Sequence, residues 1–257
     1  MKNFRAVSKL LRFLFITWFY HSLILFGNLL AFFGFKVGGW VPRMRYQWAK
    51  SVMNILNMKY TVKGTTPKAP FFLVSNHLSY LDVWVLFGSA KGTFITKSEV
   101  KNWPIVGFVL SSSGMIFVNR DKKTDVKRVN EEISKNITKY QGVFLFPEGT
   151  TSPGKEILPF KSSLFQYPAV EGIEVTSAAI TYRCDDSTID TASEICWSTD
   201  IKFPAHFWGL LKIKEFEASI TFSNQKQLNS NRKELALRTS ALIVDIFEPV
   251  KQLNASD

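Results

Sequence analysis

Short apolar runs alternate with stretches of helical periodicity from residue 59 onward, and this alternation limits the fold more than any other feature of the chain. Strands are predicted at residues 59–62, 71–75, 93–96, 115–118 and 143–146, and further strands near 175–182 and 218–222. Helices are predicted at residues 80–90, 106–111, 126–140 and 232–246, and Gly142 is expected to end the third of them. Strands that alternate with helices form βαβ units. We therefore expect an α/β fold in which a mostly parallel central sheet is flanked by helices.

The first 50 residues follow a different pattern. Four basic residues precede a long apolar run, which continues to Phe35 and is long enough for a helix to cross a bilayer. His21 and Asn28 interrupt the run, so a membrane-spanning helix, a helical hairpin at the membrane interface and a buried core helix all remain open. Four more basic residues follow the run, so the distribution of positive charge does not define the topology. We expect residues 1–50 to form a helical membrane anchor and residues 51–257 to form the α/β domain.

The composition favours a membrane partner. The formal net charge is +11 and the chain has 23 Phe and 7 Trp, which suits either nucleic acid or an anionic membrane surface. Nucleic acid is not expected as a partner, because the sequence has no zinc-finger spacing, no RNP-like aromatic strand and no basic-region heptads. Cys184 and Cys196 are the two cysteines, too few for a disulfide framework or a zinc site, so we expect the α/β domain to face the cytoplasm.

Four polar residues share one position in the predicted sheet. His77, Lys97, Arg120 and Glu148 each come just after the carboxyl end of a predicted strand. Open parallel sheets place their ligand crevice at this edge. The four side chains are therefore expected to border one site.

His77 and Asp82 are the strongest candidates for chemistry. A histidine can take a proton from a hydroxyl near neutral pH, and a nearby carboxylate can fix its tautomer and stabilise the imidazolium. Five residues turn a helix well past one revolution, so the two side chains meet only if His77 lies in a loop that folds back over the first turn. Ser79 and Asp82 have the spacing of a capping box, which predicts a helix start there. The alternative is that Asp82 only caps the helix and His77 only fills the loop.

Four motifs between about Lys59 and Lys161 resemble, in order and spacing, those of the glycerolipid acyltransferases of the 1-acylglycerol-3-phosphate acyltransferase type. The motifs are Asn76-His77-x4-Asp82, the Lys97-Ser98-Glu99 segment that leads to Pro104 and Gly107, the strand that ends at Asn119-Arg120, and Phe146-Pro147-Glu148-Gly149-Thr150-Thr151-Ser152 followed by Pro159-Phe160-Lys161.

The resemblance implies a membrane-bound enzyme that acylates a lysophospholipid. His77 would deprotonate the free hydroxyl of the acceptor, which attacks an acyl thioester directly, and Asp82 would orient and stabilise the imidazolium. The acceptor is expected to be 1-acylglycerol-3-phosphate, which gives phosphatidic acid. The donor is expected to be acyl-coenzyme A or an acyl carrier protein thioester, and no tightly bound cofactor or metal is expected.

The same resemblance assigns further residues to substrate binding. Arg120 and Lys97 would contact the acceptor phosphate, although Lys97 could also be an ordinary surface cation. The turn of Glu148, Gly149 and Thr150 would approach the acceptor, with Glu148 bonded to glycerol hydroxyls, unless it is only an ordinary turn. Lys161 completes the expected set.

Two departures from the family pattern leave the headgroup open. Thr151 stands where many members have arginine, and residues 177–181 lack the prolines of the usual fourth motif. Another lysolipid, such as lysophosphatidylcholine, lysophosphatidylethanolamine or a lyso-aminolipid, therefore remains an alternative acceptor. A hydrolase is less favoured, because the sequence has no Gly-x-Ser-x-Gly elbow and no cluster of metal ligands. A catalytically silent membrane-binding protein is the third alternative.

Overall fold

The computed structural model describes residues 1–257 except 104–105, 119–124, 199 and 252–257. Its helices are α1 Lys2–Phe32, α2 Trp40–Leu56, α3 Asp82–Ser89, α4 Val106–Ser112, α5 Asp125–Asn136, α6 Gln166–Val170, α7 Thr191–Glu194, α8 Phe203–Lys212 and α9 Arg232–Ile246. Its strands are β1 Met58–Lys63, β2 Phe72–Ser75, β3 Gly92–Lys97, β4 Ile116–Val118, β5 Gly142–Leu145, β6 Val175–Arg183 and β7 Phe216–Gln227. Short 3-10 helices lie at Ser98–Asn102 and Ser162–Phe165.

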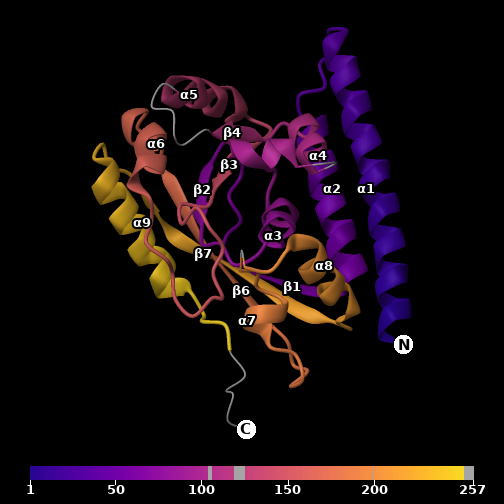
Figure 1. Ribbon diagram of the computed structural model, residues 1–257. Coiled ribbons are helices and arrows are strands. Elements are labelled where there is room, and N and C mark those ends of the chain that lie inside the picture. The colour runs from indigo at the N-terminus through magenta and orange to yellow at the C-terminus, as the bar shows by residue number, and fades with distance from the viewer. Residues whose placement is uncertain (104–105, 119–124, 199, 252–257) are drawn as a thin grey trace.

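The described strands form one seven-stranded sheet in the order β1-β7-β6-β2-β5-β3-β4 (Figure 1). The strands from β6 to β4 in this order are parallel to one another. Strand β7 is antiparallel to β6 and pairs in parallel with β1, so these two strands run in the opposite direction. The predicted α/β fold with a mostly parallel sheet is confirmed.

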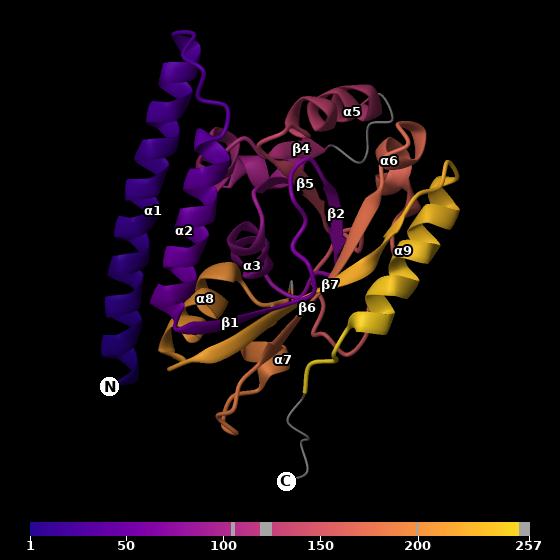
Figure 2. The ribbon, with the colours of Figure 1, turned by 180° about the vertical axis from the view of Figure 1, so that it is seen from behind.

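Helices cover both faces of the sheet (Figures 1 and 2). Helices α2, α3 and α8 lie on one face, with α1 outside them, and α5, α6 and α9 lie on the other. Strand β2 shows why both faces are filled, because Leu73 packs into the first core and Phe72 and Val74 pack into the second. Strands buried on both faces read as continuous apolar runs, as the sequence of β2 does.

The structure differs from the predicted elements in several places. Helix α5 ends at Asn136, and Thr138 and Gln141 then exchange two backbone hydrogen bonds in a turn. Tyr140 therefore leaves the helix, and its ring lies against Gly38, where an added Cβ would meet it at 2.6 Å. Gly142 was expected to end this helix, but it begins β5 instead. An added Cβ there would lie 2.4 Å from the ring of Phe71. Helix α2 begins within residues 1–50, which were expected to be helical, and continues past residue 50 to Leu56. Helices α6, α7 and α8 were not among the predicted elements.

Helix α1 has an inner and an outer side. On the inner side, the ring of Phe13 packs against Trp84 of α3 and Phe207 of α8, with centroid distances of 5.7 Å and 5.1 Å. The outer side is apolar and exposed, and it includes Phe15 and Trp18, which are 61% and 65% exposed. Among the described helices, α1 is long and apolar enough to cross a membrane.

Polar contacts join both ends of α1 to the α/β domain. Near the start, Arg5 Nη1 donates a hydrogen bond to the carbonyl oxygen of Lys212 at 2.8 Å. Near the end, Asn28 Nδ2 donates to the carbonyl oxygen of Ser112 at 3.0 Å. The helix therefore lies along the domain for most of its length.

Lys9 is expected to be an essential part of this contact. Its buried Nζ donates to the carbonyl oxygens of Leu56 at 2.7 Å and Ile213 at 2.8 Å. Lys9→Met keeps the apolar stem but leaves these carbonyls without their donor, so we expect the free energy of unfolding to fall by about 2 kcal/mol. Thermal and chemical unfolding in detergent measure the loss, with the exposed Lys2→Met as the matched control. Equal stability of the two variants would contradict the prediction.

Candidate active site

The carboxyl ends of β2, β5 and β6 meet at one edge of the sheet, because β2 lies between the other two and all three are parallel. His77 follows β2 and Glu148 follows β5. The sheet order therefore brings the first and fourth of the predicted motifs together at the expected edge.

The structure places the side chains of His77 and Asp82 in direct contact. His77 lies in the loop before α3, and Asp82 is the first residue of that helix. The distance between His77 Nδ1 and Asp82 Oδ2 is 2.7 Å. The loop thus folds back over the first turn of the helix, which is the geometry that the spacing requires.

Asp82 is fully buried and accepts further hydrogen bonds. Its Oδ2 also accepts from the backbone N–H groups of Leu78 at 2.7 Å and Ser79 at 3.0 Å, and its Oδ1 accepts from the Tyr182 hydroxyl at 2.6 Å. The bond from Ser79 N–H is one half of the predicted capping box. The other half is not formed, since the buried Ser79 hydroxyl has no hydrogen-bond partner among the described residues. Asp82 therefore organises the loop as well as the helix start.

The ring of His77 is held in one orientation. It stacks on the ring of Phe146 with a centroid distance of 4.0 Å and an interplanar angle of 7°. Because Nδ1 carries the proton that is donated to Asp82, the neutral ring keeps a lone pair on Nε2. The side chain is 20% exposed, so the ring is accessible from outside. The arrangement can accept a proton from a bound hydroxyl.

Strand β6 fixes the start of the loop. The side-chain amide of Asn76 donates to the carbonyl oxygen of Ile180 at 3.0 Å and accepts from the N–H of Ile180 at 2.7 Å. Asn76 is fully buried. The first residue of the motif is therefore paired with the strand backbone.

Glu148 lies beneath the loop and not in an open crevice. It is 3% exposed, and its two carboxylate oxygens accept from the N–H groups of His77 at 2.9 Å and Leu158 at 3.3 Å. This differs from the expected bonds to glycerol hydroxyls, because both oxygens already accept hydrogen bonds from backbone N–H groups. The geometry indicates a positioning role. Gly149 follows with φ of +73°, a conformation that other residues rarely adopt, so the turn depends on glycine.

The remaining predicted residues lie around the same edge. Lys97 is exposed at the end of β3, and Thr150 is exposed beside Gly149. Lys161 is exposed, and its backbone N–H donates to the carbonyl oxygen of Pro147 at 3.0 Å, which joins its segment to the Glu148 turn. Arg120 lies outside the described residues.

Two residues of the site were not among the predicted ones. Tyr182 lies at the end of the predicted strand at 175–182, and the spacing of the sequence gives no link to Asp82. Phe146 immediately precedes Pro147 and Glu148, so its place in that motif is a signal that could have identified it.

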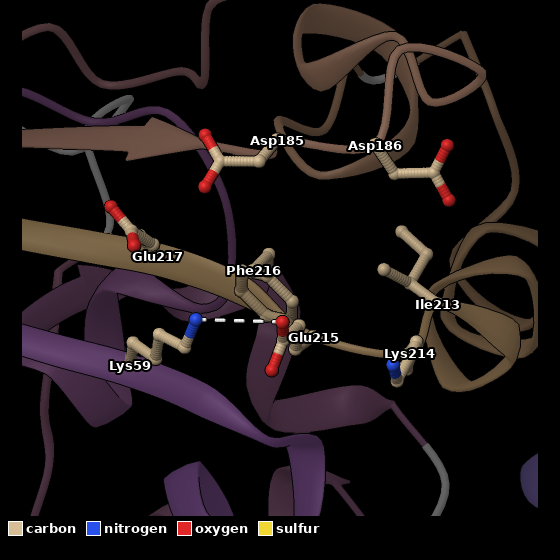
Figure 3. Close-up of a pocket in the computed structure, with 8 residues that line it drawn as sticks. All are labelled: Lys59, Asp185, Asp186, Ile213, Lys214, Glu215, Phe216 and Glu217. Carbon is tan, nitrogen blue, oxygen red and sulfur yellow. Dashed lines mark hydrogen bonds and ion pairs between the residues drawn. The ribbon is translucent and has the colours of Figure 1, made fainter.

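The pocket in Figure 3 is separate from these residues. It has a volume of about 300 Å³ and lies where β1 and β7 begin and β6 ends, and it is lined by Lys59, Asp185, Asp186, Ile213, Lys214, Glu215, Phe216 and Glu217. Several of its carboxylates are already paired, as Glu215 is with Lys59 at 3.4 Å. The pocket includes Asp185 and Asp186, which follow β6, and none of the residues around His77. Within the described residues, no group of three or more His, Cys, Asp or Glu is placed to hold a metal ion.

Comparisons with known proteins show the family and agree with the fold. The family model described as Acyltransferase matches residues 57–181. A 1-acyl-sn-glycerol-3-phosphate acyltransferase of Neisseria gonorrhoeae is 29% identical over 175 residues, 67% of this chain and 68% of the relative. A lyso-ornithine lipid O-acyltransferase of Rhizobium meliloti is 30% identical over 210 residues, 77% of this chain and 71% of the relative. The chain therefore belongs to the acyltransferase family.

A solved structure has the same fold. The crystal structure of the 1-acyl-sn-glycerophosphate acyltransferase PlsC from Thermotoga maritima matches with a TM-score of 0.68 and 21% identity, over 95% of each chain. The match includes the N-terminal helices, because it covers nearly the whole length of both chains.

Glu148 is expected to make stability depend on pH. Burial raises the pKa of its carboxyl from 4.5 to about 8; the N–H groups of His77 and Leu158 oppose this shift and the charge of Asp82 adds to it. Between those two values the folded protein binds more protons than the unfolded chain, so this group makes the free energy of unfolding fall as pH rises. Glu148→Gln cannot ionise, so it should gain stability relative to the unmodified protein from pH 5 toward pH 8, a range set by the same pKa values.

Chemical unfolding of both proteins over this pH range measures the effect. Glu171→Gln is the matched control, because Glu171 is exposed. Parallel stability curves for the unmodified protein and Glu148→Gln would contradict the prediction.

Proposed function

We propose that the protein transfers an acyl chain from an acyl thioester to the free hydroxyl of a lysophospholipid, with 1-acylglycerol-3-phosphate as the acceptor and phosphatidic acid as the product. The observation that carries this proposal is the 2.7 Å contact between His77 and a fully buried Asp82, which leaves Nε2 to act as a base. The name of the Neisseria relative supports the same acceptor.

The proposed reaction is direct transfer. Nε2 of His77 takes the proton of the acceptor hydroxyl, and the oxygen attacks the carbonyl carbon of the thioester. The carbon–sulfur bond then breaks, and the imidazolium returns the proton to the departing thiolate of coenzyme A or of acyl carrier protein. Asp82 stabilises the imidazolium through Nδ1, and Phe146 keeps the ring in line. No acyl-enzyme and no tightly bound cofactor takes part.

The acceptor phosphate is proposed to bind cations around this edge. Lys97 and Lys161 are exposed near the carboxyl ends of β3 and β5, and Arg120 follows β4 in the sequence. Glu148 and Gly149 hold the turn between them, and Thr150 is exposed on it. A forked guanidinium at Arg120 would suit a phosphate better than either lysine.

A second acceptor class is favoured by one observation. Thr151, where many family members have arginine, adds no cation beside the Glu148 turn. The Rhizobium relative is named a lyso-ornithine lipid O-acyltransferase. A lyso-aminolipid is therefore the alternative acceptor.

An acyl-transfer assay on the purified, detergent-solubilised protein tests the proposal. The acceptors are lysophosphatidic acid, lyso-ornithine lipid and lysophosphatidylcholine, each with labelled acyl-coenzyme A and acyl carrier protein donors. We expect transfer to lysophosphatidic acid, and a loss of at least about 100-fold in His77→Ala, because the general base is removed. Thermal unfolding shows that the variant is folded.

Each outcome has a defined meaning. Transfer confined to lyso-ornithine lipid would replace the proposed acceptor and keep the chemistry. Absence of transfer to every acceptor by folded protein, or wild-type rates in His77→Ala, would overturn the proposed reaction.

Residues 1–50 are proposed to anchor the acyltransferase domain, residues 51–257, on the cytoplasmic side of a membrane. Helix α1 has 31 residues, so it is about 46 Å long and could cross a hydrocarbon core of about 30 Å. However, Arg5 and Asn28 bond to the domain near opposite ends of the helix. A perpendicular α1 would carry α8 and α4 into the hydrocarbon. We therefore propose that α1 lies along the membrane surface with its outer side in the lipid.

The outer side of α1 is expected to bind lipid. Phe15, Trp18 and Phe26 are 61%, 65% and 51% exposed, and their spacing places them on one side of the helix. Replacing all three by Ser should weaken co-sedimentation with anionic vesicles by at least about tenfold, because each ring loses a favourable transfer into the apolar phase. Transfer to acceptor in detergent micelles should persist.

The control is a pair of apolar residues on another helix. Leu237 and Val244 on α9 are 66% and 58% exposed, and their replacement by Ser should leave vesicle binding unchanged. Full binding by the α1 variant, or an equal loss in the α9 variant, would show that α1 is not the main anchor.

A further inference from the structure

Strand β6 extends past its neighbour β2 at the candidate active site. The pairing of β2 with β6 ends at Ser75 and Ala178, whereas β6 continues to Arg183, which pairs with Glu217 of β7. Residues 179–183 therefore lie beyond the end of β2, beside the loop that carries His77. Figure 1 shows β6 passing beneath α3, where this loop ends. The extension provides a rigid edge for the loop.

Alternate residues of the extension hold the two ends of the motif. The backbone of Ile180 pairs with the side chain of Asn76, at the start of the loop. Tyr182 lies on the same face as Ile180, because side chains alternate along a strand, and its hydroxyl donates to Asp82 Oδ1 at 2.6 Å. Tyr182 is 1% exposed, and its ring lies 6.5 Å from that of Phe216. The hydroxyl is therefore held in place.

The two oxygens of Asp82 have different partners. Oδ2 accepts from His77 and from the two backbone N–H groups of the loop, while Oδ1 has the Tyr182 hydroxyl as its described partner. A donor at Oδ1 fixes the rotation of the carboxylate and draws part of its negative charge away from the oxygen that faces the imidazole.

We infer that Tyr182 is a positioning residue of the acyl transfer: its hydroxyl fixes the orientation and charge distribution of the Asp82 carboxylate, and thereby sets the basicity of His77. The inference rests on the proposed function, in which His77 is the base. It adds to the His-x4-Asp motif a third residue, 100 positions away in the sequence from Asp82.

Other titratable groups near His77 and Asp82 determine which part of the pH profile tests the inference. Asp82 faces His77 and Tyr182, and it interacts electrostatically with Glu148 after β5 and Cys196 after α7; Tyr182 also interacts with Tyr80. Burial raises the pKa of the Tyr182 phenol, and the charge of Asp82 raises it further, so the phenol stays protonated as a donor. Burial likewise raises the pKa of the Cys196 thiol. Glu148, with a pKa of about 8, changes charge on the alkaline side of the pH profile. The acid limb of the profile is therefore used for the comparison.

Tyr182→Phe removes the hydroxyl and keeps the ring. Without the donor at Oδ1, more of the carboxylate charge faces the imidazolium. We expect the acid limb of the kcat profile to move to higher pH by about half a unit or more, and the plateau kcat to fall about tenfold, as for one lost hydrogen bond to a charged group. The KM values for donor and acceptor should change less than about twofold, because Tyr182 touches neither substrate.

Tyr60→Phe is the matched control. The hydroxyl of Tyr60 on β1 donates to the carbonyl oxygen of Val85 at 3.4 Å and has no contact with Asp82 among the described residues. The same loss of a tyrosine hydroxyl should leave the acid limb in place. Thermal unfolding of both variants separates a loss of folded protein, which lowers kcat at every pH, from a shift of the limb.

A direct titration tests the inference without relying on activity. The chain has three histidines, so selective labelling of the imidazole nitrogens gives a simple NMR spectrum in detergent, and His77→Ala assigns the His77 signals. The titration midpoint of the His77 ring should move to higher pH in Tyr182→Phe and stay in place in Tyr60→Phe. The signals of His21, whose Nε2 lies 2.7 Å from Ser112 Oγ, serve as the internal reference.

An unchanged midpoint and an unchanged acid limb in folded Tyr182→Phe would overturn the inference, and so would an equal shift in Tyr60→Phe. The proposed function fails in a different way, namely by absence of transfer in the unmodified protein. In that case the titration still decides whether Tyr182 acts on His77 through Asp82.

Discussion

A fully buried carboxylate must take its hydrogen bonds from the protein, and this requirement at Asp82 governs the arrangement around it. Asp82 accepts two backbone N–H groups and one imidazole from the loop after β2, and one hydroxyl from β6. The loop has to fold back over α3 for the first three, and β6 has to extend past β2 for the fourth. The position of His77 is therefore a consequence of satisfying one buried charge.

The order of the strands makes this possible with residues that are far apart in the sequence. His77 and Glu148 are 71 positions apart, but β2 and β5 are parallel neighbours whose carboxyl ends meet. The segment that directly follows β5 therefore supplies both the carboxyl group of Glu148, which accepts from the His77 backbone, and the ring of Phe146, on which the His77 imidazole stacks. The site combines a local motif with two neighbouring strands, and neither part is sufficient without the other.

The sequence predicts the local part of this arrangement and little of the rest. Alternating apolar runs are sufficient for the parallel strands, and the spacing of His77 and Asp82 is sufficient for a loop that folds back, because both depend on neighbouring residues. Tyr182 could not be linked to Asp82, since that contact depends on the length by which β6 exceeds β2. The expected contact of Glu148 with substrate has the same origin: position after a strand predicts the edge of the sheet, but not whether a side chain points outward or under the loop. The extension of α2 past residue 50 to Leu56 was not predicted, because its burial against α1 and α3 is a tertiary property.

The inner side of α1 packs against Trp84 and Phe207, while its outer side is exposed and apolar. One helix thus belongs to the core of the domain and to its surface. Truncation of α1 would therefore not give a water-soluble enzyme, because it would expose the apolar core beside α3. Evolution can adjust the affinity for lipid by changing the outer stripe of α1, but every change to the inner stripe is also a change to the support of the reactive loop.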